Sequence, residues 1–218
     1  MRLTRKMNYI ENIYICLAAP LLVAIMCLRG TPRRLMIFML SGMTACLLSS
    51  YISTFLTMYY GTDRLRASVE FAPSVEEFMK LVPVLFYLIV FLPKKENVAG
   101  GCILTAIGFA TFENVCYLLE NDASNVVYLL IRGFGTGAMH IITGMILYLG
   151  FYYLWDQVWL RIAGTLGLLC VAIVYHAIYN ILVLQTGGIA QVGYVIPMIT
   201  AVAMVVFQKM KKLQSPDT

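Results

Sequence analysis

The sequence alternates between long apolar runs and short polar connections. Seven runs are long and apolar enough to span a membrane, which takes roughly 20 mostly apolar residues: about 9–28, 35–60, 72–92, 98–119, 126–154, 162–184 and 189–208. The first run follows a basic start but lacks a small-x-small cleavage site, which favours an uncleaved anchor over a signal peptide. The pattern predicts an all-α fold, a polytopic transmembrane bundle of about seven spans with room for an eighth, in one domain over 1–218.

Composition agrees with a chain that lies mostly in lipid. Hydrophobic residues make up 61% and charged residues 12%, whereas a soluble domain carries roughly 25% charged residues. Disorder is excluded, because disordered chains are poor in apolar residues. No basic run with interleaved aromatic residues indicates a nucleic-acid partner. The six cysteines lie in apolar runs without a CxxC pair, so we interpret them as small buried hydrophobic residues.

The distribution of Lys and Arg predicts the orientation, since cytoplasmic loops are enriched in both. With the N-terminus outside, the inner side carries nine: Arg29, Arg33, Arg34, Lys94, Lys95, Arg161, Lys209, Lys211 and Lys212. The outer side carries five: Arg2, Arg5, Lys6, Arg64 and Arg66. The count favours an outside N-terminus and a cytoplasmic C-terminus.

Several polar side chains lie inside the predicted spans, where a charge costs at least about 2.5–3.5 kcal/mol and marks a functional site by default. They occupy four successive spans: Glu76, Glu77 and Lys80 in the third, Glu113 and Asn114 in the fourth, Arg132 and His140 in the fifth, and His176 and Asn180 in the sixth. Both histidines of the chain are among them. This inventory suits acid–base catalysis or metal binding.

The depth of these groups predicts that they converge. Counted from the outer ends of their spans, Glu76, Glu77, Glu113 and His176 lie in one layer roughly 8–12 Å below the boundary. His140 is expected to lie deeper, fourteen residues after the start of its span at 126. Helical spacing places three pairs on shared faces: Glu76 with Lys80, His176 with Asn180, and Phe109 with Glu113.

Two further features of the fifth span have structural interpretations. Arg132 lies about one and a half turns below the outer boundary, from which its head group could extend to the surface, so we interpret it as structural. Gly133 and Gly137 form a GxxxG pair, which lets helices approach closely.

The candidate residues can be arranged for amide hydrolysis. Glu76, with Glu77, is the candidate general base on water, and His140 or Glu113 would orient that water. His176 and Asn180 could donate hydrogen bonds to the oxyanion, and Lys80 would hold the glutamates. The rival chemistry is a zinc site built from His140, His176 and Glu113; because no HExxH spacing occurs, we favour a reaction without a cofactor.

A proton-coupled transporter would use the same buried Glu, His and Lys groups. No inverted repeat of the kind found in many transporters is visible in the sequence. A non-catalytic scaffold that binds peptides at such a site is the third class of protein compatible with this inventory.

Four motifs in order resemble the PrsW-type intramembrane proteases, which belong with the type II CAAX prenyl endopeptidases and the Abi proteins in a glutamate-dependent superfamily. They are Glu-Glu-x-x-Lys at 76–80, Phe-x-x-x-Glu-Asn at 109–114, the isolated His140, and His-x-x-x-Asn at 176–180. The chain departs from the CAAX pattern: Lys80 stands one residue earlier than that branch's Arg, and Glu113 stands where it has a histidine. Both departures point to the PrsW branch.

The resemblance spans roughly residues 70–185, the predicted catalytic core. It implies an endopeptidase of the bacterial plasma membrane. Its substrates would be membrane-anchored proteins of the anti-sigma-factor type, cut near the extracytoplasmic side.

Overall fold

The computed structural model describes residues 2–120 and 125–214, and this part of the chain is helical throughout, without a strand. The long helices are joined by short connections, and a one-turn helix and a π-helix precede α4. The elements are α1 (Arg2–Cys27), α2 (Gly30–Tyr60), α3 (Arg64–Arg66), the π-helix η1 (Ala67–Phe71), α4 (Ala72–Phe91), α5 (Lys95–Glu120), α6 (Val126–Leu154), α7 (Val158–Val183) and α8 (Gly188–Gln214). The predicted all-α bundle is confirmed.

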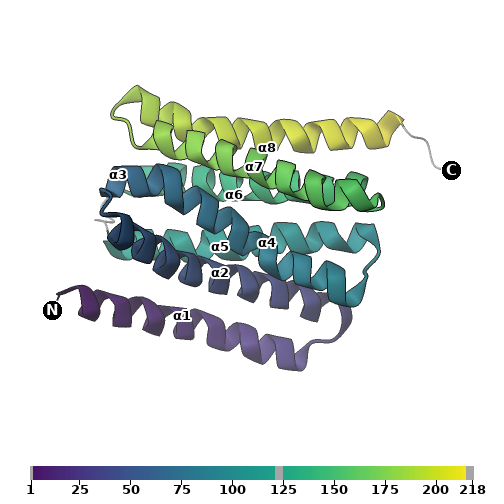
Figure 1. Cartoon of the computed structure of the whole chain (residues 1–218), viewed down its shortest axis with the longest axis horizontal. Coiled ribbons are helices and arrows are strands. Elements are labelled where there is room, and N and C mark those ends of the chain that lie inside the picture. Colours follow the sequence, from purple (N-terminus) through teal and green to yellow (C-terminus); the bar gives the residue numbers. More distant parts are fainter. Residues whose placement is uncertain (1, 121–124, 215–218) are drawn as a thin grey trace.

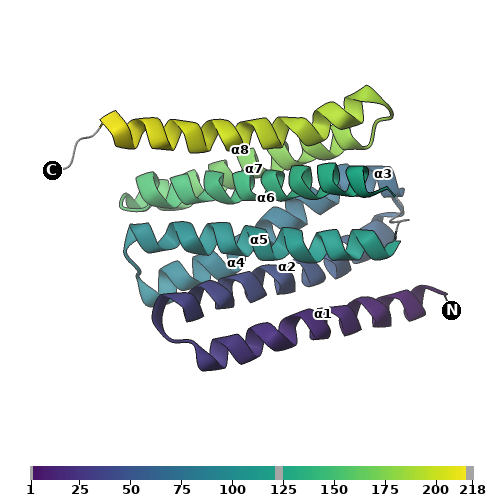
Figure 2. The same cartoon turned by 180° about the vertical axis from the view of Figure 1, so that it is seen from behind.

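The long helices lie side by side and alternate in direction (Figures 1 and 2). Helices α1 and α8 form opposite edges of the bundle, and the two chain termini lie at opposite ends. Helix α4 crosses the bundle obliquely between the end where α2 finishes and the end where α5 begins (Figure 1). It packs against α2, α5 and α7. The bundle therefore has two ends, which we name after the termini that lie there.

Length and composition qualify six of the described helices to cross a membrane: α1, α2, α5, α6, α7 and α8. The segment predicted as a span at 72–92 forms α4, which contains three charged residues and is not among the six. It nevertheless runs from one end of the bundle to the other (Figure 1). Glu77 and Lys80 are buried and Glu76 is partly buried by the neighbouring helices, which allows a polar helix to lie within an apolar bundle.

Residues with special backbone or capping properties set the helix ends. Gly61 after α2 and Gly187 before α8 have φ values of 61° and 67°, a left-handed conformation that glycine adopts without a steric cost. Asp63 and Asn125 cap α3 and α6, and their side chains accept hydrogen bonds from the backbone N–H groups of Arg66 and Tyr128. These residues define where α2 ends and where α3, α6 and α8 begin.

Two glycines allow α2 and α5 to lie in close contact. A Cβ at Gly42 of α2 would lie 2.0 Å from the Thr105 carbonyl oxygen of α5, and one at Gly108 of α5 would lie 2.0 Å from the Met39 carbonyl oxygen of α2. The expectation that another helix of the chain packs closely against Gly133 and Gly137 is wrong. A Cβ at Gly133 would meet only the Asn114 amide at 3.9 Å, and one at Gly137 would meet nothing within 4 Å.

The orientation in the membrane remains a prediction, and the structure provides suitable positions to test it. Gln185 and Lys94 are exposed in connections at the N-terminal and the C-terminal end of the bundle. In a variant without the six native cysteines, we expect Gln185→Cys to react with an impermeant thiol reagent in intact cells and Lys94→Cys to react only after lysis. The opposite labelling pattern would contradict the outside N-terminus.

Candidate active site

The first turns of α4 supply two glutamates and the lysine of the polar cluster. Pro73 occupies the first turn of α4, which continues the preceding helical segment without a break. The preceding π-helix η1 is a rare form that occurs frequently at functional sites. The Asn180 amide nitrogen of α7 donates a hydrogen bond to the Ser68 carbonyl in η1 over 2.8 Å. Helix α7 therefore holds the segment that leads into the site.

Lys80 is the centre of the cluster. Its ammonium group donates to Glu77 Oε1 at 2.7 Å, to His140 Nδ1 at 3.0 Å and to Thr143 Oγ1 at 3.0 Å. An ammonium group has three N–H donors, so all three are used. The Phe109 ring lies beneath the same ammonium, 5.3 Å from Nζ to the ring centroid. Lys80 is fixed by α4 and α6 together.

The partners of His140 determine its tautomer. A lysine ammonium can only donate, so Nδ1 of His140 accepts from Lys80 and carries no proton. The proton is then on Nε2, which donates to Glu113 Oε2 over 2.5 Å. The Phe109 ring packs on the imidazole with centroids 4.9 Å apart. His140 is therefore a neutral imidazole with both ring nitrogens engaged.

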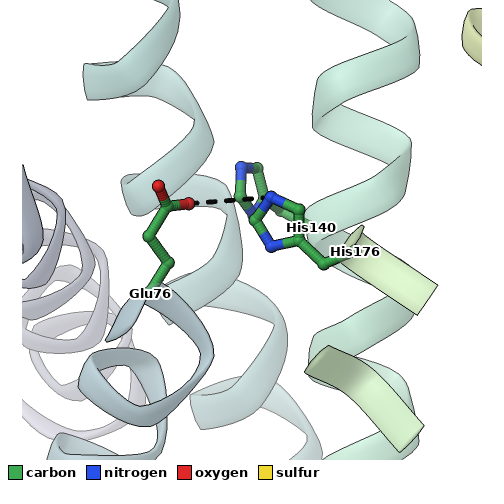
Figure 3. Close-up of side chains that lie close together, drawn as sticks. All are labelled: Glu76, His140 and His176. Carbon is green, nitrogen blue, oxygen red and sulfur yellow. Dashed lines mark ion pairs between the residues drawn. The ribbon is translucent and has the colours of Figure 1, made fainter. Parts of the chain in front are cut away.

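His176 lies between the two glutamates of α4. Its Nδ1 is 2.7 Å from Glu77 Oε1, within hydrogen-bond distance, and its Nε2 is 3.8 Å from Glu76 Oε2. The second separation is too long for a hydrogen bond. The imidazoles of His176 and His140 meet edge to face with centroids 5.1 Å apart. Figure 3 shows the three side chains of Glu76, His140 and His176 directed toward one another.

Glu113 is shared between His140 and a cation that lies about two turns earlier on α6. The Arg132 guanidinium lies 3.4 Å from Glu113 Oε1 and also donates to the Asn114 amide oxygen. It stacks on the Tyr117 ring at 3.5 Å from the centroid. Arg132 does not extend to the membrane surface, because these partners hold its head group inside the protein with the side chain 10% exposed.

Burial differs among the three carboxylates in a way that separates their roles. The side chain of Glu77 is 0% exposed, whereas those of Glu76 and Glu113 are 18% and 30% exposed. Lys80 pairs with Glu77 and Arg132 pairs with Glu113. Over the described ranges, the ion-pair partner of Glu76 is His176. Glu76 is therefore partly accessible from outside the cluster. Of the three carboxylates, it has the weakest pairing with a positively charged side chain.

The structure brings together most of the residues predicted from the sequence, including Glu76, Glu77, Lys80, Phe109, Glu113, His140 and His176. Asn114 takes part through Arg132, and Asn180 through Ser68. His140 joins the cluster although its position along α6 predicted a greater depth. Side chains lean toward the N-terminus of their own helix. Because α5 and α6 are antiparallel (Figure 2), Glu113 and His140 lean toward each other.

Two members of the cluster were not recognised as such in the sequence. Thr143 accepts from Lys80 and donates to the His140 carbonyl at 2.9 Å, and Arg132 pairs with Glu113. Thr143 follows His140 by three residues and therefore lies on the same helix face. That spacing, together with the rarity of arginine inside a span, was the available signal.

The cluster contains a donor set suited to a metal ion. One carboxylate oxygen of Glu76 and one ring nitrogen each of His140 and His176 lie within 4.8 Å of one another. Two histidines and a glutamate are a set that catalytic zinc uses, so these residues fit zinc by donor type and proximity. The zinc set predicted from the sequence has Glu113 as its third member. The structure groups Glu76 with the two histidines instead, while Glu113 contacts His140 and also pairs with Arg132.

A bundle of apolar helices with such an acid–base cluster in its interior is typical of integral membrane enzymes and of proton-coupled transporters. The chain belongs to the PrsW family of intramembrane metalloproteases, whose family model matches residues 31–207. Comparisons with curated proteins and with solved structures each found no match. The predicted resemblance is confirmed. The protein is therefore a multi-pass membrane protein and an intramembrane protease, which acts on membrane-embedded protein substrates.

Proposed function

We propose that the protein hydrolyses peptide bonds of membrane-anchored proteins with a water molecule that Glu76 activates as general base. The observation that carries this assignment is the contrast between the adjacent glutamates. Glu77 is fully buried and held by Lys80 and His176, whereas Glu76 is partly accessible and lies 3.8 Å from His176 Nε2. A general base must reach the proton it removes, directly or through one water. Glu76 meets that requirement.

The other residues orient the reacting groups. Glu77 accepts from Nδ1 of His176, so Nε2 of His176 faces Glu76 as an acceptor, and the gap between them suits a water molecule that donates to both. His140 is held in one tautomer by Lys80 and Glu113 and bounds the same space. The Asn180 amide has two N–H donors, of which Ser68 uses one. The other is the candidate oxyanion donor.

Zinc would be held by Glu76, His140 and His176, and when bound it would supply an activated water and polarise the scissile carbonyl. Both ring nitrogens of His140 already have partners, so metal binding would replace either Lys80 or Glu113 at that imidazole. The Lys80 ammonium, 3.0 Å from Nδ1, also opposes a second cation there. These contacts favour the reaction without a metal.

Reconstitution tests the proposed function against transport. The purified protein is placed in liposomes with a single-span reporter protein, and cleavage is followed together with proton flux in the same vesicles. We expect cleavage of the reporter and no flux. Flux without cleavage would favour the transporter that the buried Glu, His and Lys groups also suit.

Replacement of Glu113 with Gln separates the two chemistries. Glu113 acts through His140 and does not contact the proposed water, so we expect turnover to fall by about 10²-fold, the lower end of the range for acid–base groups. We expect no stoichiometric zinc in the wild type by elemental mass spectrometry, and no effect of chelators on turnover. One zinc per chain, lost in His176→Ala, would contradict the metal-free mechanism and leave the protease assignment intact.

A further inference from the structure

A long apolar groove lies between α2 and α4, outside the polar cluster. Its volume is about 890 Å³, and its walls include Ile37, Phe38 and Leu48 of α2 and Val82 and Phe86 of α4. Sites that hold single small molecules have volumes of roughly 300–1,000 Å³. A transmembrane helix, about 10–12 Å across and about 30 Å long, is too large for this space. The groove therefore has the dimensions of one amphiphile.

One end of the groove carries a positive charge held by neutral partners. Arg34 donates to the Tyr87 hydroxyl at 3.0 Å and to the Asn97 side-chain oxygen at 3.2 Å. Its guanidinium also lies over the Tyr87 ring, 5.9 Å from the centroid. Among the side chains that the structure describes, which do not include that of Glu96 beside Asn97, no carboxylate forms an ion pair with Arg34. The guanidinium is thus positioned for an anion that the described side chains do not supply.

The position of Arg34 along α2 places this charge at the membrane boundary. Helix α2 has 31 residues and is about 46 Å long, which exceeds the roughly 30 Å of a hydrocarbon core. Its first turns therefore reach the head-group layer. Arg34 follows the start of α2 at Gly30 by four residues, or about 6 Å. The apolar walls extend from this level toward the middle of the bilayer.

We propose that the groove binds one phospholipid with an anionic head group, whose phosphate pairs with Arg34 and whose acyl chain lies along the apolar walls. Charge complementarity, the size of the groove and its depth all support this occupant. The groove also touches the catalytic helix, because Met79 and Pro83 of α4 line it. Lys80, between them in sequence, is buried in the cluster. Met79 and Pro83 follow the site residues Glu76 and Lys80 by three positions each, so lipid in the groove supports α4 on the face that adjoins the proposed site.

Native mass spectrometry of the full chain with phosphatidylglycerol and with phosphatidylcholine tests the proposal. We expect one phosphatidylglycerol per chain, retained at collision energies that remove phosphatidylcholine. Arg34→Gln should weaken phosphatidylglycerol binding about fivefold to tenfold, from about 1 kcal/mol for one basic residue near the membrane surface and somewhat more for a charged hydrogen bond. The matched control is Arg33→Gln, an exposed neighbour that does not line the groove and should bind as the wild type does.

A second variant and a labelling measurement on the wild type test the proposal even if Arg34→Gln does not fold. Ser41→Phe, which fills the groove without changing its charge, should also weaken binding. A phosphatidylglycerol with a photoreactive acyl chain should label residues 82–91 of α4 more strongly than the exposed face of α8 near Val202. Equal binding of both lipids, equal binding by Arg34→Gln and Arg33→Gln, or equal labelling of α4 and α8 would overturn the proposal. Displacement of the label by a substrate transmembrane peptide would overturn it in favour of a substrate-docking groove.

Discussion

Replacement of Glu76 with Gln is expected to abolish measurable cleavage of a membrane-anchored reporter. The change keeps the size of the side chain and removes the carboxylate that accepts the proton from water, so turnover should fall by about 10²–10⁴-fold, toward the upper end. Because Glu76 makes no short hydrogen bond to its neighbour His176, the variant should fold and insert as the wild type does. Single-turnover cleavage in liposomes measures the loss.

Glu70→Gln is the matched control. Glu70 lies in η1, six residues before Glu76, and pairs with Arg66 on the surface of the protein. Like Glu76→Gln, this variant loses one negative charge near the start of α4. Its activity should remain within about twofold of the wild type, because exposed ion pairs contribute little. Wild-type turnover in Glu76→Gln would end the assignment of Glu76 as the base. Equal losses in both variants would show that charge near α4, and not the reacting carboxylate, matters.

Replacement of Lys80 with Met is expected to destabilise the whole bundle. Two of its three hydrogen bonds join α4 to α6, and its removal leaves the Glu77 carboxylate buried without the lysine that pairs with it. Breaking one side of a buried ion pair costs about 3–5 kcal/mol. We expect a lower thermal unfolding midpoint in detergent, followed by circular dichroism, and loss of activity with it.

Two further variants distinguish the effect of the unpaired Glu77 charge from a nonspecific effect of removing a lysine. In Lys80→Met combined with Glu77→Gln both charges are absent, so most of the lost stability should return while the enzyme remains inactive. Lys95→Met removes a lysine that pairs with Asp156 at the surface and should change stability by no more than about 1 kcal/mol. If the double variant were as unstable as Lys80→Met alone, the buried charge would not be the cause.

The sequence alone was sufficient to predict the bundle and the composition of the site. Apolar runs of about 20 residues can bury their backbone polar groups only as helices in a membrane, so the spans followed from their length. Charged residues inside those spans are costly, which made Glu76, Glu77, Glu113 and the two histidines recognisable as a set. The distances from the helix ends predicted that the three glutamates and His176 would meet, because the helical rise is constant, whereas His140 was expected to lie deeper.

Only the tertiary structure separated the roles of neighbouring residues. Glu76 and Glu77 are adjacent and chemically identical, but successive residues on a helix point about 100° apart. The packing of α6 and α7 around α4 buries Glu77 against Lys80 and leaves Glu76 facing His176. Which face is buried depends on the neighbouring helices and is not determined by the local sequence.

The same dependence explains the expectations that the structure corrected. Arg132 can reach either the membrane surface or an internal carboxylate, and the rotation of α6 against α5 directs it to Glu113. The glycines at 133 and 137 have the spacing of a helix contact, yet the close contact forms at Gly42 and Gly108 because α2 and α5 lie together. Spacing along one helix determines which residues share a face. The packing of the other helices decides what that face meets.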